Sequence, residues 1–176
     1  SDGTGGTTSA FYNQGGVIYK GLEGQATLVI GHGLAVFANG SLNSAQEKTT
    51  HIQAANAPKG TAAAGAICMA GPIRFSIIDK WTGVQYAIDE SSIGGGLNKV
   101  NRQVRIAPYN TTILSASYDW RNLRFGVTVT DVFDSTKYTD IGLSGTGPTS
   151  TSLSTSQDQV YFQPGRQIMG DITVRF

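Results

Sequence analysis

The sequence predicts an all-β fold built mainly as one antiparallel sheet of about seven strands. Short segments rich in Val, Ile, Phe, Tyr and Thr recur along the chain, and the stretches between them are rich in Gly, Ser and Thr, with 23 Gly in 176 residues. β-Branched and aromatic residues favour strands, whereas Gly and Ser favour turns. Several segments also alternate apolar and polar residues with a period of two, which is typical of strands.

We expect seven strands of about 9 to 14 residues, a length that lets a tilted strand cross a bilayer. They are Val17–Ile30, Leu34–Glu47, Gly60–Met69, Ile73–Tyr86, Pro108–Tyr118, Leu123–Phe133 and Gly165–Phe176. Short turns follow the first, third and fifth strands, and long polar stretches follow the second, fourth and sixth. Outer-membrane β-barrels sort their connections in this way, with short periplasmic turns and long outward loops.

In three of these strands one face is apolar or glycine and the other is largely polar. The apolar sets are Leu22, Gly24, Ala26, Leu28 and Ile30, then Leu123, Phe125, Val127 and Val129, then Ile168, Gly170, Ile172, Val174 and Phe176. The opposite sets are Glu23, Gln25 and Thr27, then Arg124, Gly126, Thr128 and Thr130, then Gln167, Asp171, Thr173 and Arg175. The pattern predicts one face toward lipid and one toward a wet lumen, although a soluble antiparallel sheet alternates in the same way.

Composition also favours a wall that faces lipid. Charged residues make up 14% of the chain, whereas soluble domains have roughly 25%. The net charge of +1 gives no sign of a nucleic-acid partner. No stretch reaches the roughly 18 apolar residues of a spanning helix, so a membrane location requires strands. Tyr118 and Trp120 at one rim, and Trp81 and Tyr86 toward the other, fit the aromatic girdles of such barrels.

Seven strands cannot close a bacterial barrel by themselves. Those barrels have an even number of strands, from eight upward, and an open edge cannot persist in hydrocarbon. We therefore expect residues 1–176 to form one portion of a larger barrel. The loop-like run Ser1–Ser9, with no initiator Met or secretory signal, indicates that the chain begins inside a loop.

Several segments in order along the chain resemble the C-terminal barrel region of TonB-dependent outer-membrane receptors. They are Tyr19–Gly24, Asn56–Lys59, Gly71–Ser76, Ala107–Asn110, Val132–Asp134, Pro164–Arg166 and Val174–Phe176. The resemblance implies a 22-stranded barrel in the bacterial outer membrane, closed by an N-terminal plug. It also implies import of ferric siderophores or similar scarce ligands with energy relayed by TonB. The plug, the TonB box and the earlier strands are not in this sequence.

The resemblance further implies an assembly signal in the last strand. Outer-membrane barrels end in an aromatic residue with apolar residues at alternate positions before it, and the barrel-assembly machinery recognises this strand. The matching residues here are Ile168, Ile172, Val174 and Phe176. Strand addition explains the recognition, since main-chain hydrogen bonds supply affinity and alternate side chains supply specificity.

Residues near the outer rim are the candidates for ligand contact. Arg can pair with carboxylate, catecholate or hydroxamate oxygens, and Tyr can stack and hydrogen-bond. The candidates are Gln85, Tyr86, Arg102, Tyr161 and Arg166. The alternative for each is a place in the rim girdle or in a lumenal salt bridge.

Nothing in the sequence indicates an enzyme, a cofactor or a metal site. His32 and His51 are far apart with no second ligand at useful spacing, and Cys68 is a single cysteine in an Ala-rich strand. No Gly-x-Ser-x-Gly elbow is present. Gly94–Gly96 has no strand–loop–helix context for phosphate binding, and the neighbouring pair Asp89 and Glu90 fits solvated loop carboxylates.

Two other functions remain open from the residues alone. The chain could form a small autonomous barrel or adhesin that closes by oligomerising. It could also be a soluble β-sandwich that binds carbohydrate. Solubility without detergent would indicate the sandwich, whereas a plug domain and a TonB box upstream in the same reading frame would indicate the receptor.

Overall fold

The computed structural model describes residues 16–48, 51, 53–89, 102–142 and 158–175. These residues form an antiparallel β structure, with three-quarters of them in strands. This confirms the predicted all-β class. None of them belongs to a helix long and apolar enough to span a membrane.

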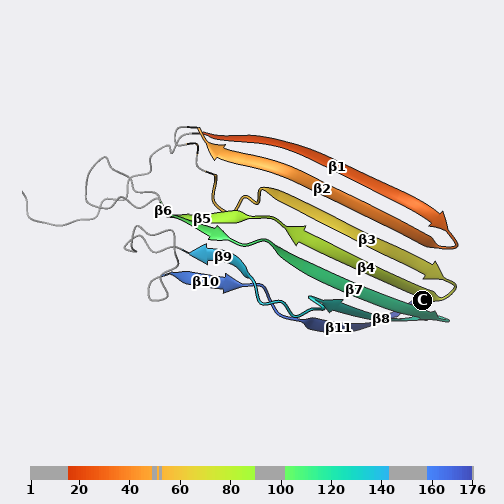
Figure 1. Cartoon of the computed structure of the whole chain (residues 1–176). Helices are drawn as coiled ribbons and strands as arrows, with labels where there is room; N and C mark the ends of the chain where they lie inside the picture. The colour runs from red at the N-terminus through yellow and green to blue at the C-terminus, as the bar shows by residue number, and fades with distance from the viewer. Residues whose placement is uncertain (1–15, 49–50, 52, 90–101, 143–157, 176) are drawn as a thin grey trace, which may run out of the picture.

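Seven strands form one continuous sheet in the order β1-β2-β3-β4-β7-β8-β11 (Figure 1). Every neighbouring pair is antiparallel and joins strands in chain order, which confirms the predicted seven-stranded meander. β1 and β11 are the two edges, and within the described residues they do not pair, so the sheet is open. The strands are β1 (Val17–Gly31), β2 (Leu34–Glu47), β3 (Gly60–Ala70), β4 (Ile73–Thr82), β7 (Tyr109–Trp120), β8 (Leu123–Thr130) and β11 (Gln167–Val174).

Three tight turns lie together at one end of the sheet, here called the turn end, after β1, β3 and β7 (Figure 1). The first turn needs glycine because Gly33 has φ 79°, and a Cβ there would overlap the carbonyl oxygen of Met69. Gly71 has φ 58° in the second turn and Arg121 has φ 53° in the third. The longer connections leave from the opposite end, here called the loop end. The loop sorting expected from the sequence is therefore present.

Two further hairpins lie where the sequence suggested long loops. β5 (Gln85–Asp89) pairs with β6 (Arg102–Ile106), and β9 (Tyr138–Gly142) pairs with β10 (Gln159–Phe162). Both hairpins extend beyond the main sheet at its loop end (Figure 1). The connections are thus more ordered than their polar composition indicated.

Two predicted strands end earlier than expected. The predicted strand Ile73–Tyr86 is divided at Gly83, whose N–H donates to the carbonyl of Gly60 at 2.8 Å, and the chain then pairs within the β5–β6 hairpin. The predicted strand Leu123–Phe133 stops at Thr130 because the chain turns at Asp131, which has φ 50°. The buried Asp131 carboxylate accepts a hydrogen bond from the N–H of Ser135 at 3.0 Å, which stabilises this turn.

The cluster of buried hydrophobic residues lies between the hairpins, whereas Ala45 is the one buried hydrophobic residue among the described residues of the main sheet. The cluster consists of Ala87 from β5, Val104 and Ile106 from β6, and Ile141 from β9, each less than 5% exposed. The main sheet is a single layer whose large apolar side chains are mostly exposed. Any apolar partner of that sheet must therefore come from outside the described residues.

Candidate functional site

The most prominent surface of the molecule is one apolar face of the main sheet. Cross-strand pairs such as Leu22↔Leu42, Phe75↔Ala116 and Phe125↔Ile172 put the apolar sets of all seven strands on the same side. Many of these side chains are exposed, from 38% for Phe125 to 74% for Leu22. The exposed members with large side chains include Ile18, Leu22, Leu28, Leu42, Ile73, Phe75, Ile77, Trp81, Tyr118, Trp120, Phe125, Val127, Ile168, Ile172 and Val174.

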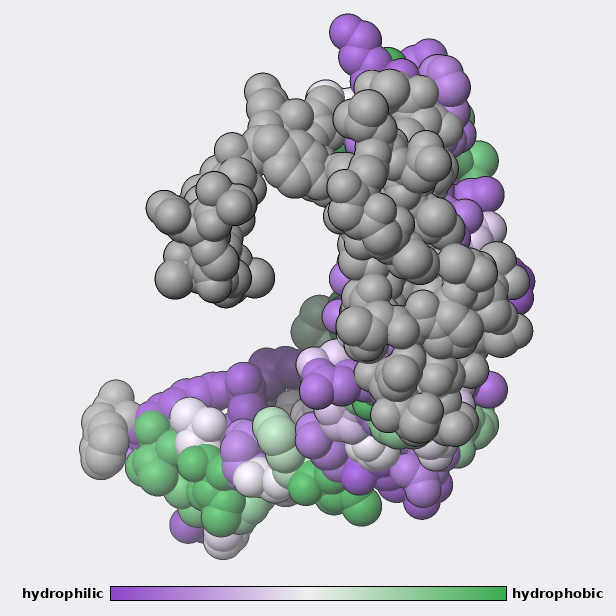
Figure 2. Space-filling model, turned by 90° about the vertical axis from the view of Figure 1, so that its left-hand side faces the viewer, coloured by the Kyte–Doolittle hydropathy of each residue, from purple (hydrophilic) through white to green (hydrophobic). Residues whose placement is uncertain are grey.

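This face is the convex side of a curved sheet. Figure 2 looks along the strands from the loop end and shows that the sheet is curved, with its lower strands turning toward the left of the view. Over the lowest strands in that view, hydrophobic side chains gather on the outer surface and hydrophilic side chains line the inner surface (Figure 2). We call the two surfaces the convex face and the concave face.

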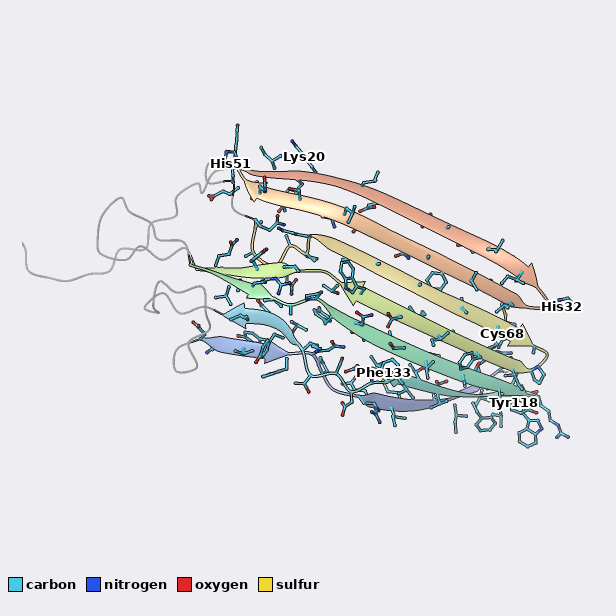
Figure 3. All side chains as sticks on the ribbon, viewed as in Figure 1. Lys20, His32, His51, Cys68, Tyr118 and Phe133 are labelled. Atoms are coloured by element: carbon cyan, nitrogen blue, oxygen red, sulfur yellow. The ribbon has the colours of Figure 1, made fainter. Side chains whose placement is uncertain are left out.

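Aromatic residues mark both ends of the convex face. Trp120 pairs with Leu123 at the turn end, where Tyr118 is also labelled in Figure 3. Trp81 pairs with Ala62 toward the loop end. Both indoles are on the convex face and partly exposed, as expected for aromatic girdles. Tyr86, the fourth residue expected in a girdle, lies instead in the β5–β6 hairpin.

A polar row limits the apolar face toward the loop end. Asp79 is the first charged residue there, and its carboxylate accepts hydrogen bonds from Thr112 Oγ1 at 2.6 Å and Asn110 Nδ2 at 2.8 Å. These bonds satisfy a carboxylate that would be costly in an apolar setting without partners. On β4 and β7 the apolar band therefore lies between Asp79 and the turn end, whereas on β1 and β2 it continues to Leu22 and Leu42, four residues beyond the positions in register with Asp79.

The concave face is more polar than the convex face, although Val29, Met69 and Met169 are exposed on it, and it holds a charged cluster at the turn end. The Asp119 carboxylate accepts from Arg74 Nη1 at 2.5 Å, from Arg124 Nε at 2.7 Å and from Arg175 Nη2 at 3.2 Å. These residues come from β7, β4, β8 and the position just after β11. A single carboxylate thus links four consecutive strands. We call these four residues the Asp119 cluster.

A polar hollow of about 500 Å³ lies across β1, β2 and β3. Ser41 Oγ is 2.9 Å from Thr61 Oγ1, and the Asn43 amide donates to Ser41 Oγ at 2.9 Å. Its lining residues are Glu23, Gly24, Gln25, Asn39, Gly40, Ser41 and Thr61. Such a surface suits contact with water or a polar ligand better than contact with lipid.

The predicted ligand residues lie around the two hairpins, and two of them have structural partners. Gln85 is 6% exposed, and its amide donates to the carbonyl of Thr139 at 2.6 Å, which ties β5 to β9. The ammonium of Lys59 lies 5.4 Å from the centroid of the Tyr86 ring, in a cation–π contact. Gln85 therefore contributes to the scaffold, and its role in ligand contact stays a prediction.

Of the other three predicted ligand residues, Tyr161 is joined to Gln85 through Thr139, whose carbonyl accepts from the Gln85 amide and whose hydroxyl donates to the carbonyl of Tyr161 at 3.3 Å. Tyr161 in β10 is half-exposed, and its hydroxyl donates to Gln159 Oε1 at 3.1 Å. Arg166 precedes β11 with an exposed side chain, and its N–H donates to Asp134 Oδ1 at 2.8 Å. Arg102 begins β6 opposite Asp89, and its side chain lies outside the described residues.

The proposed assembly strand corresponds to β11. Ile168, Ile172 and Val174 lie on the convex face and are 50–69% exposed, so this alternation is as predicted. Phe176 lies outside the described residues. Whether these residues act as an assembly signal stays a prediction.

The residues considered for metal chemistry lie apart. Figure 3 shows His32 at the turn end and His51 at the loop end. Cys68 pairs with Phe75 between β3 and β4 and is a free thiol. No group of three or more possible ligands from His, Cys, Asp and Glu is present in the part of the chain that the structure describes. Gly94–Gly96 and Glu90 fall outside that part.

Sequence reasoning missed the Asp119 cluster and the contacts of Lys59 and Thr139. The alternation had placed Arg124 and Arg175 on one face, but only the register brings both to Asp119. No family model matches the sequence, and a comparison with curated proteins also finds no match. Function therefore has to be argued from the two faces and the hairpins.

Proposed function

We propose that the chain is a C-terminal, membrane-embedded segment of an outer-membrane β-barrel receptor. The parent protein would import a ferric siderophore or a similar scarce ligand in a TonB-dependent manner. The convex face carries the proposal, because large apolar side chains are exposed there on six of the seven strands, and the seventh, β3, contributes mainly alanine. Exposed apolar patches on soluble monomers rarely exceed a few hundred Å². A face of this extent needs lipid or a second apolar layer.

The dimensions of the face favour lipid. The apolar run from Leu123 to Val129 covers about 20 Å at about 3.3 Å per residue, as does the run from Leu22 to Leu28. At the strand tilt of roughly 35–45° in such barrels, these runs rise about 15 Å along the membrane normal, so they fit within the roughly 25 Å height of the apolar band on outer-membrane barrels. Trp81 and Trp120 flank the band, which fits two membrane interfaces. A β-sandwich would bury this face against a second sheet, and the described residues contain no such sheet.

The receptor part of the proposal rests on the resemblance, the loop sorting and the polar concave face. In the parent barrel the concave face would line the lumen, where a plug and an incoming ligand are in contact with water. The hairpins β5–β6 and β9–β10 would extend the wall outward, with exposed Tyr161 and Arg166 available to ligand. The proposed partners are lipid, the missing strands and plug, TonB through that plug, and the barrel-assembly machinery.

Tryptophan fluorescence in vesicles tests the membrane part. The chain has two Trp residues, so Trp81→Phe and Trp120→Phe each leave a single probe. In the parent protein, with any other Trp replaced by Phe, lipids brominated near the headgroup should quench both probes more than lipids brominated near the chain end. If a water-soluble agent quenches both Trp probes and the brominated lipids quench neither, the convex face does not face lipid.

Uptake by cells tests the receptor part separately. Cells that carry the parent protein should grow on a ferric siderophore as sole iron source, and growth should require TonB. Cells that carry only these 176 residues should not grow, because no plug couples them to energy. Growth without TonB, or uptake by the segment alone, would reject the receptor and leave the membrane result unaffected.

A further inference from the structure

The apolar pattern of β11 does not by itself select one register. Among the described residues β11 pairs with β8 only, and its convex residues Ile168, Gly170, Ile172 and Val174 all suit an apolar surface. A slip by one residue would turn them to the concave face and is strongly disfavoured. A slip by two residues keeps every side chain on its own face. Some other interaction must distinguish the observed register from these two-residue slips.

The contacts of Arg175 distinguish the observed register from the two-residue slips. Its N–H donates to the carbonyl of Asn122 at 2.8 Å, and its Nη2 donates to Asp119 Oδ1 at 3.2 Å. Asp119 is itself held by Arg74 from β4 and Arg124 from β8. The carboxylate therefore has a fixed position against which the end of β11 can be aligned.

Each slip would lose this contact in a different way. The observed register pairs Gly170 with Val127. If Ile172 paired with Val127, Arg175 would lie opposite Arg124, and like charges in opposed positions are destabilising. If Ile168 paired with Val127, Arg175 would move about 7 Å along the strand and pass the β7–β8 turn.

A second contact supports the observed register but does not exclude the slip that pairs Ile168 with Val127. Asp171 lies opposite Gly126, and its carboxylate occupies the space that a Cβ on Gly126 would need. The slip that pairs Ile168 with Val127 would place Asp171 opposite Arg124, which is a favourable exchange. The contact of Arg175 with Asp119 is then the interaction that opposes this slip.

We propose that Asp119 is the docking site of the C-terminal arginine Arg175 and that this contact sets the register of β11. Asp119 is a positioning residue, because it acts on the edge strand through Arg175. The register of β11 also sets the position of its free edge. The unpaired backbone groups of that edge must match those of the strand that pairs with it. A slipped β11 would present that edge two residues out of place.

Disulfide trapping measures the register directly. In a Cys68→Ala background, Val127→Cys is combined in turn with Gly170→Cys, Ile168→Cys or Ile172→Cys. Directly opposed residues have Cα atoms about 4.5 to 5.5 Å apart, within the range of a disulfide. In the membrane-inserted parent protein, a membrane-permeant oxidant should link mainly the pair at 127 and 170.

Arg175→Gln should raise the yield of the 127–168 link, relative to the 127–170 link, by about fivefold, since exposed ion pairs are modest in strength. The 127–172 link should rise less, although loss of the Arg175 charge removes one obstacle to it. Asp119→Asn should have a similar effect, and Arg175→Gln should then add nothing to it. Arg175→Lys should restore part of the native ratio. These four results together would support the proposal.

Arg166→Gln is the matched control, because Arg166 lies at the other end of β11 and its guanidinium has no partner among the described residues. It should leave the ratio unchanged. The ratio is measured only on folded protein, so a general loss of stability does not alter it. The proposal fails if Arg175→Gln lowers the amount of folded protein and leaves the ratio unchanged. It also fails if the effects of Asp119→Asn and Arg175→Gln are additive.

Discussion

Val127 and Thr128 offer a sharp test of which face meets lipid. They are adjacent in β8 and similar in shape, but Val127 lies on the convex face opposite Ala116 and Gly170, whereas Thr128 lies on the concave face. Val127 is also midway between the turn end and the polar row at Asp79. Arg at the middle of a lipid-facing wall costs about 2 to 4 kcal/mol. At about 3 kcal/mol, Val127→Arg should lower the ratio of folded to unfolded protein by roughly a hundredfold.

Urea titration of the parent protein in lipid vesicles measures this free energy. Thr128→Arg should cost much less, because a wet concave face can solvate the charge. Leu123→Arg at the turn end should cost about 0 to 1 kcal/mol, since the penalty decreases toward the membrane interface. Equal costs at Val127 and Thr128 would refute the assignment of the faces. A cost at Leu123 as large as that at Val127 would indicate a protein layer on the convex face in place of lipid.

Three further outcomes follow from the structure. Gln85→Ala should destabilise the hairpins by about 1 kcal/mol, because it removes the hydrogen bond from the Gln85 amide to the half-buried carbonyl of Thr139; faster hydrogen exchange in β5 and β9, with β3 unchanged, would be the measured sign. Gly33→Ala should cost more free energy of unfolding than Gly31→Ala, since a Cβ has open space at Gly31 and a backbone clash at Gly33; chemical denaturation would show equal losses if this reasoning is wrong. Deleting Phe176, or Phe176→Asp, should lower the amount of parent protein inserted in the outer membrane without changing the ligand affinity of inserted molecules; normal insertion of both variants would show that Phe176 is not the assembly signal.

The main sheet could be predicted because the necessary information is local. Alternation determines which side chains share a face, and residues such as Gly31 and Gly33 mark a turn wherever they occur. The two hairpins could not be predicted in the same way. Both Arg102–Ile106 and Tyr138–Gly142 are only five residues long, and the apolar face of each is small, with Val104 and Ile106 in the first and Ile141 in the second. They are held by contacts between distant segments, such as the bond from Gln85 to Thr139.

The candidate site was predicted less completely, and for the same reason. The convex apolar set followed from alternation within each strand. The Asp119 cluster did not, because Arg74 and Arg175 are far from Asp119 in the sequence and meet it only through the pairing of β4, β7, β8 and β11. Gln85 was assigned to ligand contact from its residue type and expected position. Its burial depends on the packing of β9 against β5, which no local pattern records.

The number of strands in the sheet restricts how its edges can be closed. Six antiparallel steps separate β1 from β11, so the two edge strands run in the same direction. Joining β11 directly to β1, in the same molecule or in a second copy around a common axis, would create a parallel seam. An all-antiparallel barrel needs an odd number of additional strands between these edges. A 22-stranded barrel meets this condition, whereas a ring made only of copies of this sheet does not.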